Sequence, residues 1–208
     1  MFKRLEHFDM NRAALIIIDM QNDFLLEDAP IPCPGGLETV RHIERLAQVF
    51  RLHSRPVIYT QESHRKEKVD FGLELMYEEP EHCLEESNGI DFISTLKPTC
   101  GDFIVCKRRY SAFFATDLDL LLRGMGIDTL VLTGVATDVC VRATAQDAQQ
   151  HSYNVIVPVE CVAGTSVKSH QAALDNISYL FGITVPLEHL LSACEQSLEI
   201  KGEKRSLV

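Results

Sequence analysis

The chain has 208 residues, 46% of them hydrophobic, which is enough for one sizeable core and short for two ordinary domains. Its 30 acidic residues outnumber 20 Lys and Arg, and no basic run resembles a nucleic-acid-binding surface. The N-terminus lacks the apolar stretch of a signal peptide, and no apolar run approaches the ~18 residues of a membrane span. We expect one domain over 1–208, located in the cytoplasm, without nucleic-acid or membrane partners.

Six short apolar segments predict β-strands. In chain order they are 14–19, 56–60, 102–107, 129–134, 154–158 and 183–185. They lack the alternation of a half-exposed strand, so they indicate strands that are covered on both faces. The sheet is therefore expected to be parallel.

Helical periodicity marks the segments between these strands. An apolar stripe that starts at Leu37 predicts a helix after the first strand. A second stripe over 139–148 predicts a helix after the fourth strand, with Thr137 or Asp138 as its N-cap and Cys140 in its first turn. The charged, aperiodic stretch 62–98 is expected to be a long excursion at the sheet edge, forming a wall of the site or an oligomer contact.

Three reactive side chains stand where predicted strands end. Asp19 ends the first strand, Lys107 ends the third, and Cys140 follows the fourth after a short turn. In open α/β sheets, ligand sites form at the carboxyl ends of the strands, near the point where strand order reverses. We therefore expect a carboxylate, an ammonium and a thiol to meet at one edge.

This combination suits nucleophilic catalysis by a cysteine. A free thiol with a pKa near ~8.5 is mostly protonated at neutral pH, so Cys140 needs groups that favour its thiolate. Lys107 and the helix start near Asp138 both supply positive charge, and Asp19 can pass the proton to the leaving nitrogen. The backbone N–H groups of Ala136 and Cys140 are candidates for binding the developing oxyanion.

Each of these residues also has a simpler interpretation. Alone, Cys140 is a small core residue, as most of the seven cysteines are expected to be, Asp19 is a strand-end cap and Lys107 is a solvated charge. The alternative to an enzyme is a binding protein, namely a domain that binds a nucleotide or flavin. Residues 19–23, DMQND, place negative charge where such a module has glycines and a phosphate, which favours the enzyme.

Three motifs resemble the isochorismatase-like cysteine hydrolases. They are DMQNDFL (19–25), KRRYSAFFATDLDLLL (107–122) and TGVATDVCVRATAQDA (133–148), and their order matches the family along nearly the whole chain. The resemblance implies a single Rossmann-like α/β domain of three α/β/α layers, with a six-stranded parallel sheet in the order 3-2-1-4-5-6. It also implies a catalytic set of Asp19, Lys107 and Cys140, and a cis peptide at Val135–Ala136 beside the oxyanion site.

Within that superfamily, the stretches RYSAFFATDLDLLLR (109–123) and HQAALDNISYLFG (170–182) are similar to amidohydrolases that act on ureidoacrylate, biuret or N-carbamoyl amines. The resemblance thus implies cleavage of a C–N bond in a small linear ureide or N-carbamoyl compound through an acyl- or carbamoyl-cysteine. A nicotinamidase-like amidase and a catalytically silent binding scaffold are the alternatives. Family members commonly assemble, so a homo-oligomer, a dimer or tetramer, is expected.

No cofactor and no metal are expected. Nicotinamidases carry a metal after the second strand, held by an Asp-x-His pair and a further His. Here Glu62 and His64 keep an acidic-x-His pair, but residues 65–70 supply no second His, so both are expected in a surface loop. The candidate substrate contacts are Gln21, Phe24, Arg65, Tyr110 and Phe114.

Overall fold

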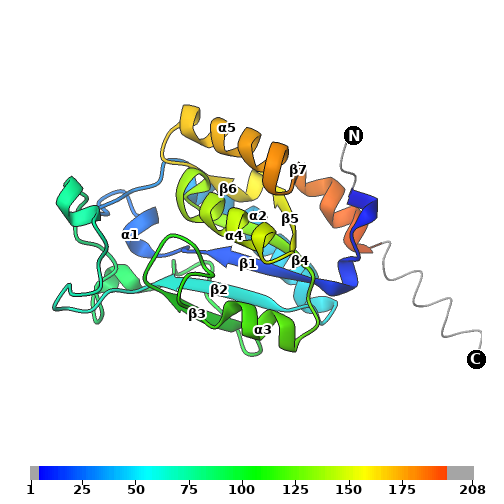
Figure 1. Ribbon diagram of the computed structural model, residues 1–208, viewed down its shortest axis with the longest axis horizontal. Coiled ribbons are helices and arrows are strands. Elements are labelled where there is room, and N and C mark those ends of the chain that lie inside the picture. Colours follow the sequence, from blue (N-terminus) through cyan, green and yellow to red (C-terminus); the bar gives the residue numbers. More distant parts are fainter. Residues whose placement is uncertain (1–4, 196–208) are drawn as a thin grey trace, which may run out of the picture.

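A parallel sheet runs through the middle of the molecule with helices on both faces (Figure 1). The computed structural model describes residues 5–195; residues 1–4 and 196–208, which the predicted domain includes, lie outside that part. The strands are β1 Ala13–Ile18, β2 Val57–Glu62, β3 Phe103–Lys107, β4 Thr129–Val135, β5 Asn154–Pro158, β6 Val162–Ala163 and β7 Ile183–Val185. Their order is β3-β2-β1-β4-β5-β7, with β6 paired to β4.

The α-helices fill the connections between the strands. They are α1 Asn22–Leu25, α2 Gly36–Leu52, α3 Leu118–Gly124, α4 Arg142–Gln150 and α5 Val167–Asn176, and a further helix occupies 187–195. Short 3₁₀ turns lie at Leu5–His7, Met10–Arg12, Glu74–Tyr77, Asn88–Ile90 and Val159–Cys161, and π-helical turns at Thr137–Val141 and Ile177–Phe181. In the part of the chain that is described, no helix has the length and apolar character needed to span a membrane.

Strand β1 shows why the sheet is sandwiched between helices. All six of its residues are 0% exposed. Because successive side chains point to opposite faces, Leu15 packs in the core beneath α2 and helix 187–195, whereas Ile16 packs in the core beneath α3, α4 and α5. The predicted α/β/α layering and the order of the six predicted strands are confirmed, and the two-residue β6 is an addition.

Two local predictions were wrong in detail. Val40, Ile43 and Ala47 of the predicted apolar stripe are buried, but Leu37, its first member, is 48% exposed. Neither Thr137 nor Asp138 caps the helix that carries Cys140. The Thr137 hydroxyl contacts His170 Nδ1 at 2.9 Å, and Asp138 accepts hydrogen bonds from Thr165.

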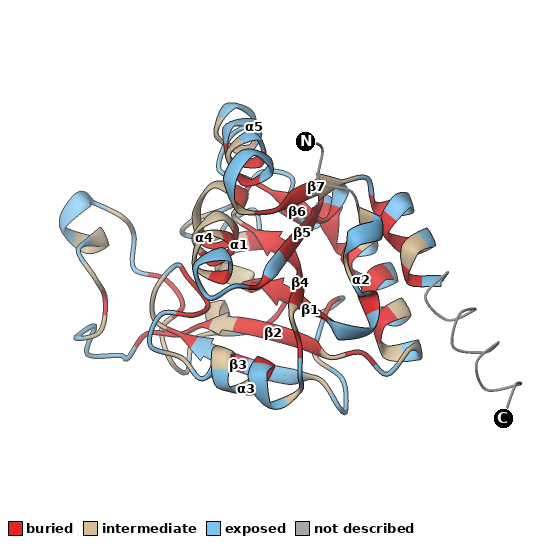
Figure 2. Cartoon of the chain, turned by 45° about the vertical axis from the view of Figure 1, so that its right-hand side comes forward, coloured by how far each residue is buried: buried red, intermediate tan, exposed pale blue. Residues whose placement is uncertain are grey.

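The connection from β2 to β3, residues 63–102, is the β2–β3 excursion. It projects beyond the carboxyl ends of the strands and is largely exposed at its outer end (Figures 1 and 2). Its only helical segments are the two 3₁₀ turns at Glu74–Tyr77 and Asn88–Ile90. The predicted irregular excursion is therefore present, and its inner part reaches the candidate site.

Candidate active site

Sheet register brings the three predicted reactive residues to one edge. Strand β1 pairs with β4 up to Ile18↔Gly134, so Asp19 and the turn that leads to Cys140 leave the sheet side by side. Asp19 adopts φ 51°, a left-handed conformation that Asp tolerates better than most residues. Lys107 reaches across from β3, two strands away from β1.

The three side chains meet around the Lys107 ammonium. Lys107 Nζ lies 2.8 Å from Asp19 Oδ2 and 3.6 Å from Cys140 Sγ. The Thr60 hydroxyl donates to Asp19 Oδ1 at 2.7 Å, which fixes the second carboxylate oxygen. Asp19 and Lys107 are 1% exposed and Cys140 is 6% exposed, so Cys140 is the most exposed member of the set; Asp19 and Cys140 both line the pocket.

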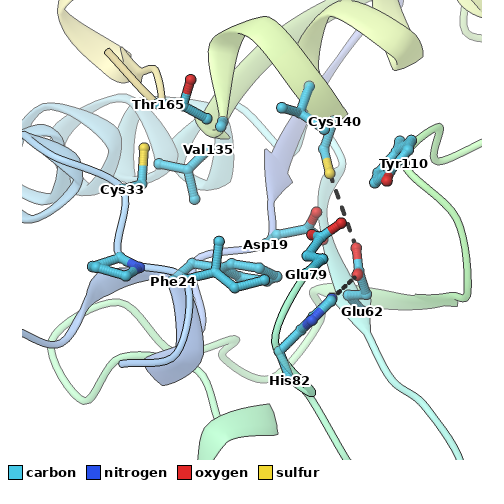
Figure 3. Close-up of a pocket in the computed structure, with 14 residues that line it drawn as sticks. Asp19, Phe24, Cys33, Glu62, Glu79, His82, Tyr110, Val135, Cys140 and Thr165 are labelled. Atoms are coloured by element: carbon cyan, nitrogen blue, oxygen red, sulfur yellow. Dashed lines mark hydrogen bonds and ion pairs between the residues drawn. The ribbon is translucent and has the colours of Figure 1, made fainter. Parts of the chain in front are cut away.

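A second carboxylate, Glu62, completes the cluster and was not foreseen. It is the last residue of β2, pairs in register with Lys107, and forms a close ion pair with the Lys107 ammonium. Cys140 Sγ lies 3.9 Å from Glu62 Oε2 (Figure 3). The expected surface position for Glu62 was wrong because β2 continues two residues beyond the predicted strand end and buries it.

Burial and this second carboxylate set the protonation of the site. Burial raises the pKa of the Cys140 thiol well above its ordinary value, and Asp19 and Glu62 add to the effect while Lys107 opposes it. Burial also raises the pKa of Asp19. Burial works against the charge of Lys107, yet the surrounding acidic groups hold its pKa well above its usual range. Lys107 does favour the thiolate, as expected, but burial, together with Asp19 and Glu62, outweighs its effect on the pKa of Cys140.

Two buried histidines extend the cluster on the side of Glu62. His82 Nε2 lies 2.9 Å from Glu62 Oε1, and His64 Nε2 lies 3.5 Å from the same oxygen. His82 Nδ1 lies 2.8 Å from the Pro80 carbonyl oxygen, so its N–H donates there and leaves Nε2 free to act as a ligand. Within the described chain, neither ring nitrogen of His64 makes a hydrogen bond, although the side chain is 1% exposed.

These three residues fit a divalent metal ion. One ligand atom each from Glu62, His64 and His82 lies within 4.8 Å of the other two, and two imidazoles with one carboxylate are a ligand set that suits catalytic zinc. The ligand count made from the sequence was wrong because it stopped at residue 70, whereas the second His arrives from the far side of the β2–β3 excursion. The expected surface position of His64 was wrong as well.

The backbone turn before Cys140 is shaped by Gly134 and a cis peptide. Gly134 has φ 101°, and a Cβ there would stand 2.0 Å from the Ile18 carbonyl oxygen, so only glycine fits. The Val135–Ala136 peptide bond is cis, as the resemblance implied. Ala136 and Cys140 both line the pocket, which keeps their backbone N–H groups as candidates for the oxyanion site.

The pocket above Cys140 has one apolar and one polar side (Figure 3). Phe24 and Tyr110, two predicted substrate contacts, line it. The other three do not. Gln21 is fully buried and bonds the backbone of Glu62, while Arg65 pairs with Asp70. Phe114 is 59% exposed and lies outside the lining.

Three further lining groups had no sequence prediction. Glu79 and His82 come from the β2–β3 excursion, and Thr165 precedes α5. The apolar side is built by Phe24, Ile31, Pro32, Val135 and Val139. No local pattern in the sequence marked Glu79, His82 or Thr165, because the elements that carry them meet only in the folded chain.

Comparisons with known proteins point to one family. The sequence profile of the isochorismatase domain matches residues 13–189. A maleamate amidohydrolase from Pseudomonas putida is 32% identical over 84% of this chain and 83% of its own length. A ureidoacrylate amidohydrolase from Serratia proteamaculans is 33% identical over 84% of this chain and 79% of its own. The crystal structure of an isochorismatase-like hydrolase from Alkaliphilus metalliredigens aligns with TM-score 0.80 and 37% identity, covering 87% of this chain and 98% of that one.

Proposed function

The chain belongs to the isochorismatase family and is an amidohydrolase of small amides or ureides, and on that premise we propose a covalent mechanism at Cys140. The substrate is a small linear ureide or N-carbamoyl compound, and the intermediate is an acyl- or carbamoyl-cysteine. The observation that carries this proposal is the contact of one ammonium, on Lys107, with both the thiol and the Asp19 carboxylate.

In the first step, Cys140 Sγ attacks the substrate carbonyl carbon while its proton passes to Asp19. The resting group is a thiol, so the base has to act as the S–C bond forms. Because burial raises the pKa of Asp19, its carboxylate is a stronger base than an exposed aspartate. Lys107 holds the carboxylate in place and balances the negative charge that develops on sulfur.

The second half of the reaction returns the proton. The C–N bond breaks as Asp19 gives its proton to the departing nitrogen, which leaves as ammonia or an amine. A water molecule, deprotonated by Asp19, then attacks the same carbonyl carbon, breaks the C–S bond and restores the Cys140 thiol. The backbone N–H groups of Ala136 and Cys140 bind the oxyanion in both steps.

The cluster of Glu62, His64 and His82 would hold a divalent metal ion beside this machinery. Such an ion, when bound, supplies a Lewis acid that polarises a carbonyl or a bound water. The chain's own residues do the rest: His82 is oriented by the Pro80 carbonyl, and Glu62 connects the cluster to Lys107. This cluster is the specific observation that favours a second candidate, a nicotinamidase-like amidase.

A substrate panel tests the proposal. The wild type is assayed for ammonia release from linear ureides, biuret, N-carbamoyl amines, nicotinamide and simple amides, with and without added zinc. Turnover of ureides or carbamoyl amines above nicotinamide is the expected result, and the reverse order selects the second candidate. Ammonia from none of these compounds would support the binding scaffold.

The nucleophile is tested by Cys140→Ser. We expect a loss of at least about 10³-fold in kcat, because the oxygen nucleophile is weaker and the site is arranged for sulfur. The control is Cys100→Ser, since Cys100 is an exposed thiol remote from the pocket. Full activity in Cys140→Ser, with a normally folded protein, would exclude the covalent mechanism.

A further inference from the structure

The pocket that exposes Cys140 is lined by acidic groups. Its charged lining residues are Asp19, Glu62 and Glu79, together with the imidazole of His82. In the part of the chain that the structure describes, no Lys or Arg lines this pocket. Among the described residues, a substrate whose carbonyl reaches Cys140 therefore meets carboxylates and one imidazole along the polar side of the pocket, and no Lys or Arg.

Nearby cations already have partners. Lys107 lies beneath the pocket with its side chain 0% exposed, bound between Asp19 and Glu62. The two arginines that follow it in the chain turn away from the pocket. Arg108 pairs with Asp70 and Glu85, and Arg109 donates to backbone carbonyls.

Glu79 differs from the other two carboxylates, because no Lys or Arg of the described chain forms an ion pair with it. Glu62 and Asp19 both bind Lys107, whereas the groups that lower the pKa of Glu79, against the effect of burial, are His82 and the Tyr110 hydroxyl. Glu79 is half-buried at the pocket and Tyr110 is 43% exposed beside it. A carboxylate in this position attracts a cation or an N–H donor and repels an anion.

We propose that Glu79 selects substrates by the charge of the part remote from the scissile C–N bond, accepting amides or ureides that carry an ammonium or neutral N–H group there and rejecting those that carry a carboxylate. This selection rests on the proposed hydrolysis at Cys140. It separates this chain from the relatives named above, since maleamate and ureidoacrylate both carry a carboxylate. The apolar side at Phe24 and Val139 accommodates the linker between the two ends.

Two charge-matched substrate series test the selection. The first is aminoethylurea, propylurea and N-carbamoyl-β-alanine; the second is β-alaninamide, butyramide and succinamate. In each series the molecules differ chiefly in the charge of one end. We expect kcat/KM to fall from the cation through the neutral compound to the anion, with at least about tenfold between the two ends. The order must hold after dialysis against a chelator and again with zinc, so that metal charge is not mistaken for selection by the protein.

The variant Glu79→Gln keeps the shape of the side chain and removes its charge. It should raise kcat/KM for the anion, lower it for the cation, and so reduce the cation-to-anion ratio at least about fivefold. Glu78→Gln is the matched control, because Glu78 is exposed, lies outside the pocket lining and changes the net charge equally. An unchanged ratio in Glu79→Gln, or a wild type that prefers the anions, overturns the proposal.

Thiol labelling gives a readout that needs no turnover. Aminoethyl, propyl and carboxyethyl methanethiosulfonate differ in charge and react with a thiol to give a mixed disulfide. Their relative rates at Cys140, divided by those at the exposed Cys100 and measured by peptide mass spectrometry, should follow the same order from cation to anion. In Glu79→Gln, the relative labelling rates of the three reagents at Cys140 should differ less than in the wild type.

These outcomes separate the selection from the hydrolysis. Charge-ordered labelling without ammonia release would refute the proposed reaction and keep the selection. Ammonia release that is equal for cation and anion would keep the reaction and refute the selection. A Cys140 that reacts with none of the three reagents would refute both, since a closed pocket admits no substrate.

Discussion

The floor and the wall of the site come from two different kinds of structure. The floor consists of Asp19 directly after β1, Lys107 at the end of β3, and Cys140 in the π-helical turn that follows β4, so it is anchored to paired strands. The wall at Glu79 and His82 comes from the β2–β3 excursion, which has only two 3₁₀ turns. In our proposal, the groups that need fixed positions for the chemical step are carried by the sheet, and the groups that recognise the substrate are carried by the loop.

We expect the effects of substitutions on stability and activity to differ between the floor and the wall in the same way. The floor groups are almost fully buried and hold one another's charges, so removing one leaves the others uncompensated. The side chains on the excursion are more exposed, and Leu73, Met76 and Tyr77 at its outer end are 60%, 77% and 78% exposed. Substitutions on the floor are expected to cost stability and activity together, whereas substitutions in the wall change affinity or selectivity.

The largest effect is expected from Lys107→Met. It leaves the buried carboxylates of Asp19 and Glu62 facing each other, which costs about 3–5 kcal/mol of unfolding free energy, and it abolishes ammonia release. Urea unfolding and the ammonia assay measure the two losses. The control Lys66→Met removes an exposed pair with Glu86 and should cost less than about 1 kcal/mol. An equal loss of unfolding free energy in the two variants would show that the buried ion pairs of the floor contribute no more than an exposed pair.

Metal binding gives the next largest effect and involves both regions. Glu62 belongs to the sheet, whereas His82 belongs to the excursion, so His82→Ala should weaken zinc binding at least about 10²-fold by removing one ligand. Equilibrium dialysis in the Cys140→Ser background measures this, because Asp19, Glu62 and Cys140 form a second cluster of possible ligands. His189→Ala, at an exposed His, is the control. Failure of the parent protein to bind about one zinc ion per chain would show that the cluster is only structural.

The sequence predicted the floor because its signals are local. A polar residue at the end of an apolar strand marks one candidate position, and the convergence of several such positions at one sheet edge located Asp19 and Lys107. The sequence did not predict the buried position of Glu62, because polar Gln61 interrupts the apolar run and the last residues of β2 were interpreted as the start of a loop. The cis peptide followed from the resemblance to a family, since spacing alone gives no reason for it.

The wall could not be predicted because its contacts join distant segments. His82 approaches Glu62 only after 19 intervening residues have folded back, held by hydrogen bonds such as His64 N–H to the Cys83 carbonyl at 2.8 Å. Gln21 was expected to touch substrate, but its side chain ties β2 to the excursion instead. Neither placement leaves a periodic pattern, and periodicity was the main signal available.

A smaller effect is expected at the far end of the sheet, where Arg51 of α2 binds Asp102 just before β3. Burial works to raise the pKa of Asp102, but Arg51 and Thr99 lower it below its ordinary value. A depressed pKa contributes stability above the unfolded-state pKa, and that contribution is lost as pH falls through the folded-state value. Asp102→Asn should therefore cost about 1–2 kcal/mol at pH 7, and its difference from wild type should shrink below about pH 4. Asp28→Asn, at an exposed site, is the control and should change the free energy of unfolding, measured by thermal unfolding, by less than about 0.5 kcal/mol at pH 7.

The smallest effect is expected from Tyr110→Phe, in the wall. Burial, together with Glu79 and Glu74, raises the pKa of Tyr110 to about 12, so at neutral pH its hydroxyl is protonated and donates to Glu79. Without this hydrogen bond the Glu79 carboxylate is no longer held at the pocket, which should raise KM for aminoethylurea about three- to tenfold with kcat unchanged. Tyr179→Phe, at a residue 80% exposed, is the control. A fall in kcat with KM constant would instead place the Tyr110 hydroxyl in the chemical step. The wall would then contribute to catalysis, which we assign to the floor alone.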